Sequence, residues 1–346
     1  MSLKLYIPKF EWGNHLMIEI FARGSDGKAE ISKEGASFFT LVDNPENSDW
    51  ILIPAFISSM THEGGKQVIH ETHKLAQRYS KPFGVFSNSD LIVNPGVESL
   101  YIFTPGAYGS FKNQVELPAV LPYDPVLRWM KDGWSPQDRV SVGFCGQATR
   151  NPLKTIKDFL TVEKLRLNKF LGLSPFLHIP RFLPAYQRGL LLHSVRKSKL
   201  IQTDFILRSH YKGGASSVAD SLRVEEDFYQ NIASNLFTLC IRGMGNYSVR
   251  FYQTLAMGRI PVLIDTDSLL PFSDQLDYRD LIVSVPYAQR FRTDHYILSY
   301  LEGKTPEDLR EIQRRCRNLW LENFQLSGML HNLYQQMKKS SLGSQG

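Results

Sequence analysis

The sequence has no apolar run approaching the roughly 20 residues that a membrane-spanning helix requires. Its opening residues, MSLKLYIPKF, lack the uninterrupted apolar core of a signal peptide and resemble a first β-strand instead. Apolar residues make up 42% and charged residues 21% of the chain, values that exclude a disordered protein. We therefore expect a globular, cytoplasmic protein without a membrane anchor.

Cysteine is scarce, and its spacing excludes a disulfide framework. The three cysteines, Cys145, Cys240 and Cys316, are odd in number and far apart, and two of them fall in predicted strands. We expect them to be buried, reduced thiols.

Charge of neither sign is strongly in excess. The net charge of +6 and the sequence pI near 9.0 suit an anionic ligand, an acidic membrane surface or nucleic acid. A basic cluster at residues 188–199 is typical of a solvated face, with peripheral contact with an anionic membrane surface or a polyanionic glycan as the alternative. The aromatic residues do not alternate with basic strands as base-stacking platforms do, so we expect no nucleic-acid partner.

Length and periodicity predict two domains, because 346 residues exceed what one hydrophobic core usually covers. Strand patterns fall at residues 3–8, 37–42, 50–54, 82–87 and 101–104, and the clearest helix covers residues 66–80. A second alternating series runs from residues 140–144 to 282–285. A last helix is expected from Thr305, with Pro306 in its first turn.

This alternation predicts an α/β protein with two Rossmann-like parallel-sheet domains facing each other across a cleft. We place an N-terminal domain at residues 1–135, a C-terminal domain at residues 136–304 and a final helix at residues 305–338. The carboxyl ends of both sets of strands then meet at one crevice.

The most informative segment, residues 237–264, reads as strand, glycine loop, short helix and strand. Ser248 is placed to cap a helix that ends at Gly258, and its start follows the loop containing Gly243 and Gly245. Free N–H groups at that helix start, together with the helix dipole, favour a phosphate. The residues expected to hold it, besides the two loop glycines and Ser248, are Arg242, Arg250 and Gln253. An ordinary crossover with solvated arginines is the alternative.

The complete string resembles the signature of the exostosin family, glycosyltransferase family 47. It comprises RG at 242–243, SVR at 248–250, LAMGRIPV at 255–262, DTD at 265–267 and LPF at 270–272. The segments SVGFCG at 141–146, DFILR at 204–208, DWILIP at 49–54 and FSNSD at 86–90 extend the resemblance more thinly. It implies a GT-B fold and an inverting transfer of sugar from a UDP-sugar to a saccharide or glycan hydroxyl. In that fold, residues 1–135 are the acceptor-side domain and residues 136–304 the nucleotide-sugar-binding domain, and by analogy the helix over residues 305–338 crosses back to the first domain. Where the family usually has Glu, this chain has Gln253.

Catalytic candidates lie where predicted strands of the first domain end. An acceptor hydroxyl needs a base, and we rank Asp90 first, then Glu63, then His62. Each also has a structural interpretation, as a turn former, a helix-start acid or a loop histidine. Arg208 is a further candidate for the diphosphate, with pairing to a nearby acid as its alternative.

Two apparent metal motifs are discounted. The string HETH at 70–73 lacks the spacing that places two histidines on one helix face. The Asp265-Thr266-Asp267 string matches a manganese motif of another glycosyltransferase architecture, but its context resembles exostosin. We expect no metal and no cofactor beyond the nucleotide-sugar co-substrate.

In a second hypothesis, the protein binds a nucleotide-sugar or a glycan but does not catalyse transfer. Gln253 offers a ribose hydroxyl a neutral hydrogen bond in place of a charge-assisted one. The chain is then a catalytically silent nucleotide-sugar- or glycan-binding partner of another glycosyltransferase.

Overall fold

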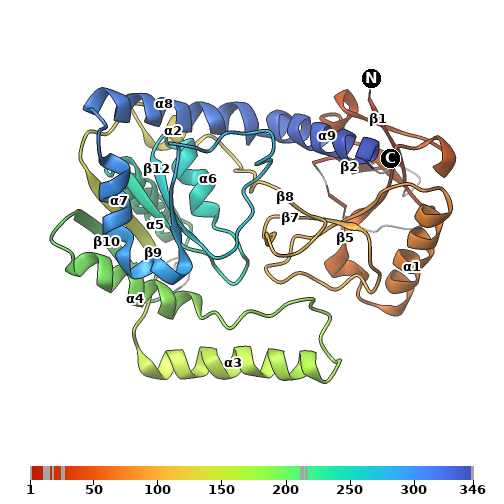
Figure 1. Cartoon of the computed structure of the whole chain (residues 1–346), viewed down its shortest axis with the longest axis horizontal. Coiled ribbons are helices and arrows are strands. Elements are labelled where there is room, and N and C mark those ends of the chain that lie inside the picture. The colour runs from red at the N-terminus through yellow and green to blue at the C-terminus, as the bar shows by residue number, and fades with distance from the viewer. Residues whose placement is uncertain are drawn as a thin grey trace.

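A computed structural model describes residues 2–10, 16–17, 19–24, 28–210, 214 and 217–343. Two parallel sheets lie side by side along the long axis of the molecule, the first in red to yellow and the second in green to blue (Figure 1). Helices flank both sheets. The predicted α/β class with two Rossmann-like sheets is therefore confirmed.

The first sheet has six strands in the order β4-β1-β5-β6-β7-β8, all paired in parallel. They are β1 Leu3–Tyr6, β4 Phe39–Leu41, β5 Trp50–Phe56, β6 Phe83–Phe86, β7 Tyr101–Thr104 and β8 Gln114–Glu116. Six of the seven residues of β5 are buried, as expected of a central strand covered on both faces. A small antiparallel pair, β2 Phe21–Arg23 and β3 Ala29–Ile31, lies outside this sheet.

The second sheet has five parallel strands in the order β10-β9-β11-β12-β13. They are β9 Ser141–Gln147, β10 Gln202–Arg208, β11 Phe237–Cys240, β12 Ile260–Asp265 and β13 Val283–Pro286. After β9 the chain pairs first on one side, with β10, and then returns to pair on the other side, with β11. The order therefore reverses between β9 and β11, and ligands bind open parallel sheets at the carboxyl end of such a switch point.

The helices preceding the C-terminal segment are α1 Glu63–Arg78, α2 Pro125–Trp129, α3 Pro152–Phe170, α4 Pro184–Lys197, α5 Val218–Ala233, α6 Val249–Ala256 and α7 Thr293–Leu301. The predicted helix over residues 66–80 begins three residues earlier, at Glu63. His62 is its N-cap, and its Nδ1 atom accepts a hydrogen bond from the Gly65 N–H at 3.1 Å. Residues 63–65, which lie outside the predicted helix, form its first turn, and Gly65 allows close packing on the Met60 backbone.

The C-terminal segment forms two helices, α8 Pro306–Asn323 and α9 Leu326–Gly343, where the sequence suggested one. Thr305 and Asp308 make the capping box that starts α8. Figure 1 shows α8 along the second sheet and α9 along the first. The contact with the first sheet is specific, because the Trp50 Nε1 atom donates to the Met337 carbonyl at 2.9 Å.

The three cysteines are free and buried, as predicted. Burial raises the pKa of the Cys240 and Cys316 thiols to about 12, which keeps both protonated and unreactive. Within the described ranges, none of the helices combines the length and the apolar character needed to cross a bilayer.

Candidate anion site between the two sheets

A cavity of about 790 Å³ lies at the carboxyl edge of the second sheet, over the switch point between β9 and β11. Its walls come from the ends of β9 and β10, from α4 and α5, and from the glycine loop with the start of α6. The first domain contributes Asp90, which follows β6. Residues from both domains therefore line the cavity, at the position where the sequence predicted a shared cleft.

Helix α6 presents its N-terminus to this cavity. Ser248 is its N-cap, and the serine side chain makes no capping hydrogen bond. Ser248, Val249 and Arg250 all line the cavity. The positive end of the helix dipole therefore lies at the cavity wall, where it favours an anion.

Arg250 supplies a cation to the same wall. Its guanidinium lies 4.2 Å from the Phe144 ring centroid and 5.6 Å from that of Phe228, and its Nη2 atom donates to the Cys145 carbonyl at 2.8 Å. Within the described part of the chain, its Nε atom is buried without a hydrogen-bond partner. Burial lowers the pKa of this arginine, which nevertheless stays charged at neutral pH. A partly buried arginine held by aromatic rings and a carbonyl is a suitable partner for a diphosphate.

Gly146 is the reason that Arg250 fits. A Cβ atom at Gly146 would lie 2.7 Å from the Arg250 Nη2 atom. We expect Gly146→Ala to displace the guanidinium and to weaken UDP binding by roughly tenfold, measured by calorimetric titration. The matched control is Gly64→Ala, whose new Cβ makes only an ordinary 3.6 Å contact with His62. Equal affinity of the Gly146 variant and the wild type would show that Arg250 does not contact the ligand.

Arg242 has a different role from the one that the sequence suggested. It is 4% exposed, and its guanidinium donates to the Met244 and Gly245 carbonyls at 2.7 and 3.1 Å. It also donates to Asn246 Oδ1 at 2.7 Å and to Tyr108 Oη at 2.9 Å. These bonds use its donors within the protein, so Arg242 holds the glycine loop against the first domain, and it does not line the cavity where we expected it to hold a phosphate.

Asn246 completes this junction between the domains. Its Nδ2 atom donates to the Ala107 carbonyl at 3.1 Å and to the Asp267 carbonyl at 3.0 Å. Asp267 in turn accepts from the Ser110 N–H at 3.0 Å, and Asp265 accepts from the Ser268 N–H at 2.9 Å. The Asp-x-Asp string is therefore part of a turn and of the domain contact. The described residues contain no group of three or more side chains suited to a metal ion.

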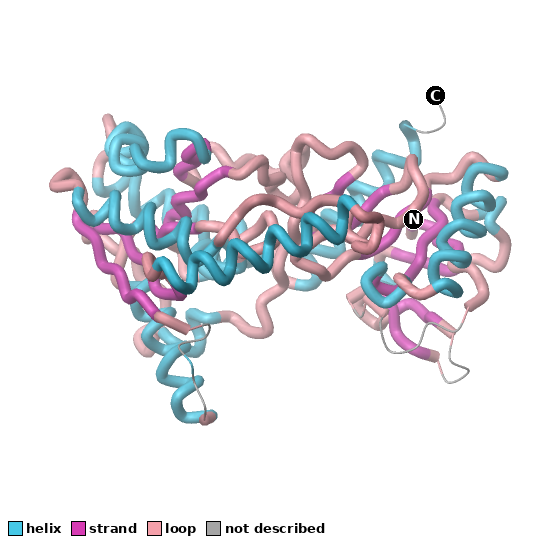
Figure 2. The backbone as a smooth tube through the Cα atoms, turned by 90° about the horizontal axis from the view of Figure 1, so that it is seen from below, coloured by secondary structure: helices cyan, strands magenta, loops and turns pink. Residues whose placement is uncertain are grey.

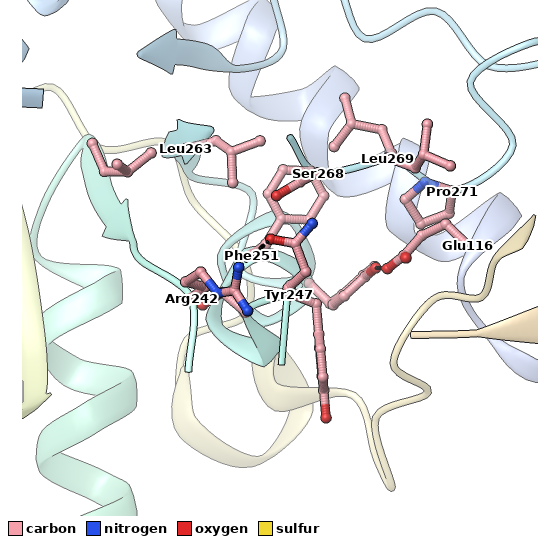
Figure 3. Close-up of a pocket in the computed structure, with 13 residues that line it drawn as sticks. Glu116, Arg242, Tyr247, Phe251, Leu263, Ser268, Leu269 and Pro271 are labelled. Atoms are coloured by element: carbon pink, nitrogen blue, oxygen red, sulfur yellow. Dashed lines mark hydrogen bonds between the residues drawn. The ribbon is translucent and has the colours of Figure 1, made fainter. Parts of the chain in front are cut away.

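A narrow pocket beside this junction is shown in Figure 3, where Glu116 and Arg242 lie on opposite sides. Glu116 is buried and accepts a hydrogen bond from the Ala107 N–H at 2.6 Å. Burial raises the pKa of its carboxyl group well above the usual value. The Tyr252 Oη atom of α6 donates to the same carboxyl group at 3.4 Å, which joins the two domains. Because β8 is short and ends in this acid, neither the strand nor this contact was predicted.

Arg208 and Gln253 both line the cavity. The Arg208 Nη2 atom donates to the Val224 carbonyl at 2.9 Å and pairs with Asp227 at 3.4 Å. Arg208 therefore makes the pairing with a nearby acid that was the alternative to a diphosphate role. The Gln253 amide nitrogen donates to Tyr229 Oη at 3.1 Å. This bond orients the amide, whose carbonyl oxygen remains an acceptor for a ligand hydroxyl.

Gly243 lines the cavity, and Gly245 lets the first domain approach the loop. A Cβ atom at Gly245 would lie 2.9 Å from Asp90 Oδ1 and 2.6 Å from the Tyr247 ring. Of the three catalytic candidates, the structure brings only Asp90 to the cavity. Glu63 and His62 lie at the start of α1 and do not line it, since His62 caps that helix and Glu63 occupies its exposed first position.

The aromatic rings around Arg250 were missed in the sequence. Phe144 sits within the SVGFCG strand, where it reads as core, and Phe228 and Tyr229 sit within α5. The local sequence around Arg250 does not indicate which aromatic rings will pack on its guanidinium. Only the pairing of β9 with β11 brings Phe144 beneath α6.

Comparison with known proteins supports the family resemblance. Residues 185–301 match the model of the Exostosin GT47 domain. The exostosin-1 homolog of Caenorhabditis elegans is 28% identical over 100 residues, which is 29% of this chain and 26% of that protein. The probable glucuronosyltransferase GUT1 of Oryza sativa subsp. japonica is 33% identical over 60 residues, 17% of this chain and 14% of that protein. The chain thus matches about a quarter or less of the length of these relatives.

Solved structures give weaker similarity. A Thermobaculum terrenum O-GlcNAc transferase mutant aligns over 100% of this chain and 69% of its own, with 12% identity and a TM-score of 0.36. A glycosyltransferase from Rickettsia africae aligns over 87% of this chain and 85% of its own, with 11% identity and a TM-score of 0.32. The resemblance to the exostosin family of glycosyltransferases, predicted from the sequence, is confirmed by the family match over residues 185–301.

Proposed function

We propose that this protein is an inverting glycosyltransferase that moves a sugar from a UDP-sugar to a saccharide or glycan hydroxyl. The observation that supports it most is the position of Arg250, a partly buried arginine beside the α6 N-terminus in the interdomain cavity. Its guanidinium packs on the rings of Phe144 and Phe228 and donates to the Cys145 carbonyl, and its Nε atom has no hydrogen-bond partner among the described residues. An unpaired cation at a helix start is suited to the diphosphate of a nucleotide donor.

In the proposed reaction, the acceptor oxygen attacks the anomeric carbon while the bond from that carbon to the β-phosphate oxygen breaks. Negative charge grows on the departing UDP, and Arg250 with the α6 N–H groups stabilises it. The amide oxygen of Gln253, oriented by Tyr229, accepts a hydrogen bond from a ribose hydroxyl. The acceptor proton goes to a base on the opposite wall.

We assign that base to Asp90. It is the catalytic candidate that lines the cavity, and it faces the donor loop at Gly245 across the domain junction. A carboxylate from the first domain and a diphosphate site from the second place the acceptor between them, as transfer with inversion requires.

We expect Asp90→Asn to lower kcat by about a hundredfold, because the amide cannot take the proton. The Kd for UDP should stay within about twofold, since Asp90 does not contact the diphosphate. Release of UDP from a panel of UDP-sugars, with and without saccharide acceptors, measures the first effect. The control is Asp132→Asn, an exposed aspartate outside the cavity. Full activity in the Asp90 variant would contradict the assignment.

The alternative is that the protein binds a nucleotide-sugar without turning it over, because Gln253 stands where the family usually has Glu. Measurements of binding and of turnover distinguish this hypothesis from the enzyme. It predicts that UDP binds and that no UDP-sugar in the panel is turned over, with or without acceptor. Turnover that is lost in Arg250 variants excludes it.

A further inference from the structure

The longest helix of the second domain, α3, extends away from the sheets. Figure 1 shows it below the rest of the molecule, and Figure 2, viewed from below, shows it in front. One side packs inward, where Val162 is buried in a small cluster with Leu91 and Ile179 and with Leu165 at its margin. The opposite side has no packing partner within the described chain.

That opposite side is apolar. Leu153, Ile156, Leu160 and Leu167 follow the three- and four-residue spacing of one helical stripe, and their exposed fractions are 77, 57, 62 and 57%. The apolar surface continues through the last residue of the helix, Phe170, to Leu171 and Leu173 beyond it, and all three are exposed. Exposed leucines scattered singly need no explanation, whereas a continuous stripe on a protruding helix indicates a binding surface.

The same stripe carries positive charge. Lys157 and Lys164 are exposed and flank the apolar stripe along one edge by helical position. Helix α3 has five basic and two acidic residues in all. One of the acids, Glu163, pairs with Arg166 and Arg181 at 3.7 and 3.1 Å, which takes it away from the two lysines.

We propose that α3 docks in the interface of a membrane containing anionic phospholipid. The apolar stripe would lie among the acyl chains near the headgroups, while the two lysines reach the lipid phosphates. A second copy of this chain is a poorer occupant, because a two-fold contact would bring the lysines of one stripe against those of the other. This inference does not depend on the proposed activity.

The test is co-sedimentation of the full chain with vesicles, either pure phosphatidylcholine or phosphatidylcholine with 30% phosphatidylserine. We expect the wild type to pellet with the anionic vesicles. The triple variant Ile156→Gln/Leu160→Gln/Leu167→Gln leaves the net charge unchanged. It should bind the anionic vesicles at least roughly tenfold more weakly, because it removes most of the apolar stripe. Lys157→Gln/Lys164→Gln should bind roughly thirtyfold more weakly to anionic vesicles, given the attraction of each lysine to an anionic surface.

The matched control is Leu127→Gln, which changes an equally apolar side chain, 85% exposed, on α2. It should bind vesicles like the wild type. All variants should keep the wild-type melting temperature and the UDP-induced shift, since none touches the core or the cavity. Failure of the wild type to pellet, or equal pelleting of the triple-glutamine variant, would overturn the proposal. So would a dimer in light scattering that the same variant dissociates, in the absence of vesicle binding.

Discussion

Replacement of Arg250 by methionine is expected to abolish UDP binding while leaving the ligand-free protein within about 1 kcal/mol of wild-type stability. The guanidinium is partly buried among aromatic rings, and burial lowers its pKa. The charged side chain therefore reduces the folding stability of the ligand-free protein. Methionine fills similar space and removes that cost. The loss of the bond to the Cys145 carbonyl offsets part of the gain.

The corresponding loss of function should be large. Truncating one partner of a desolvated charge pair costs about 4 kcal/mol, which is roughly a thousandfold in kcat/KM. Thermal denaturation with and without millimolar UDP separates the two effects, because a ligand of the folded state raises the melting temperature. Arg279→Met is the control, since that arginine is exposed and paired with Asp277 outside the cavity. A normal UDP shift in the Arg250 variant would exclude this side chain as a diphosphate ligand.

Unlike Arg250→Met, Arg242→Met is expected to act on stability, with a loss of about 4 kcal/mol in the free energy of unfolding. Its removal leaves the Asn246 and Tyr108 side chains and two loop carbonyls without their donor at a buried domain junction. Denaturant titration measures the loss. Asn246→Ala, which removes the two bonds that its Nδ2 atom donates and the two that its Oδ1 atom accepts from Arg242 and Thr266, should cost about 2 kcal/mol.

An Arg242→Met protein that is as stable as the wild type but fails to bind UDP would reverse this assignment. It would restore the sequence interpretation, in which Arg242 holds the phosphate. The two arginines that flank the glycine loop thus make a matched pair, one expected to act on binding and the other on stability.

The segment around α6 was predictable because its signals are local. The apolar runs of β11 and β12, the capping position of Ser248 and the stop at Gly258 lie within 28 consecutive residues. Gly258 adopts a φ of +61° immediately after the helix, the conformation that the stop requires. Asp90 was also predictable, since a residue after a parallel strand faces the crevice wherever the strand is placed.

Other features depend on contacts that no local pattern shows. Arg242 is taken into the domain junction by Tyr108, 134 residues earlier in the chain. Residues 62–65 fell outside the predicted helix because glycine normally disfavours a helix, yet close packing of Gly65 on the Met60 backbone makes a glycine necessary there. The short strand β8 has polar residues at Gln114 and Glu116, and both are buried because they accept hydrogen bonds from the Tyr108 and Ala107 N–H groups at 2.8 and 2.6 Å.

A crystal structure of the protein with UDP tests the central claim most directly. The account predicts diphosphate oxygens within hydrogen-bond distance of the Arg250 guanidinium and of the N–H groups that begin α6, with the ribose near Gln253. UDP bound elsewhere, or bound in this cavity with its phosphates turned away from Arg250, would contradict it.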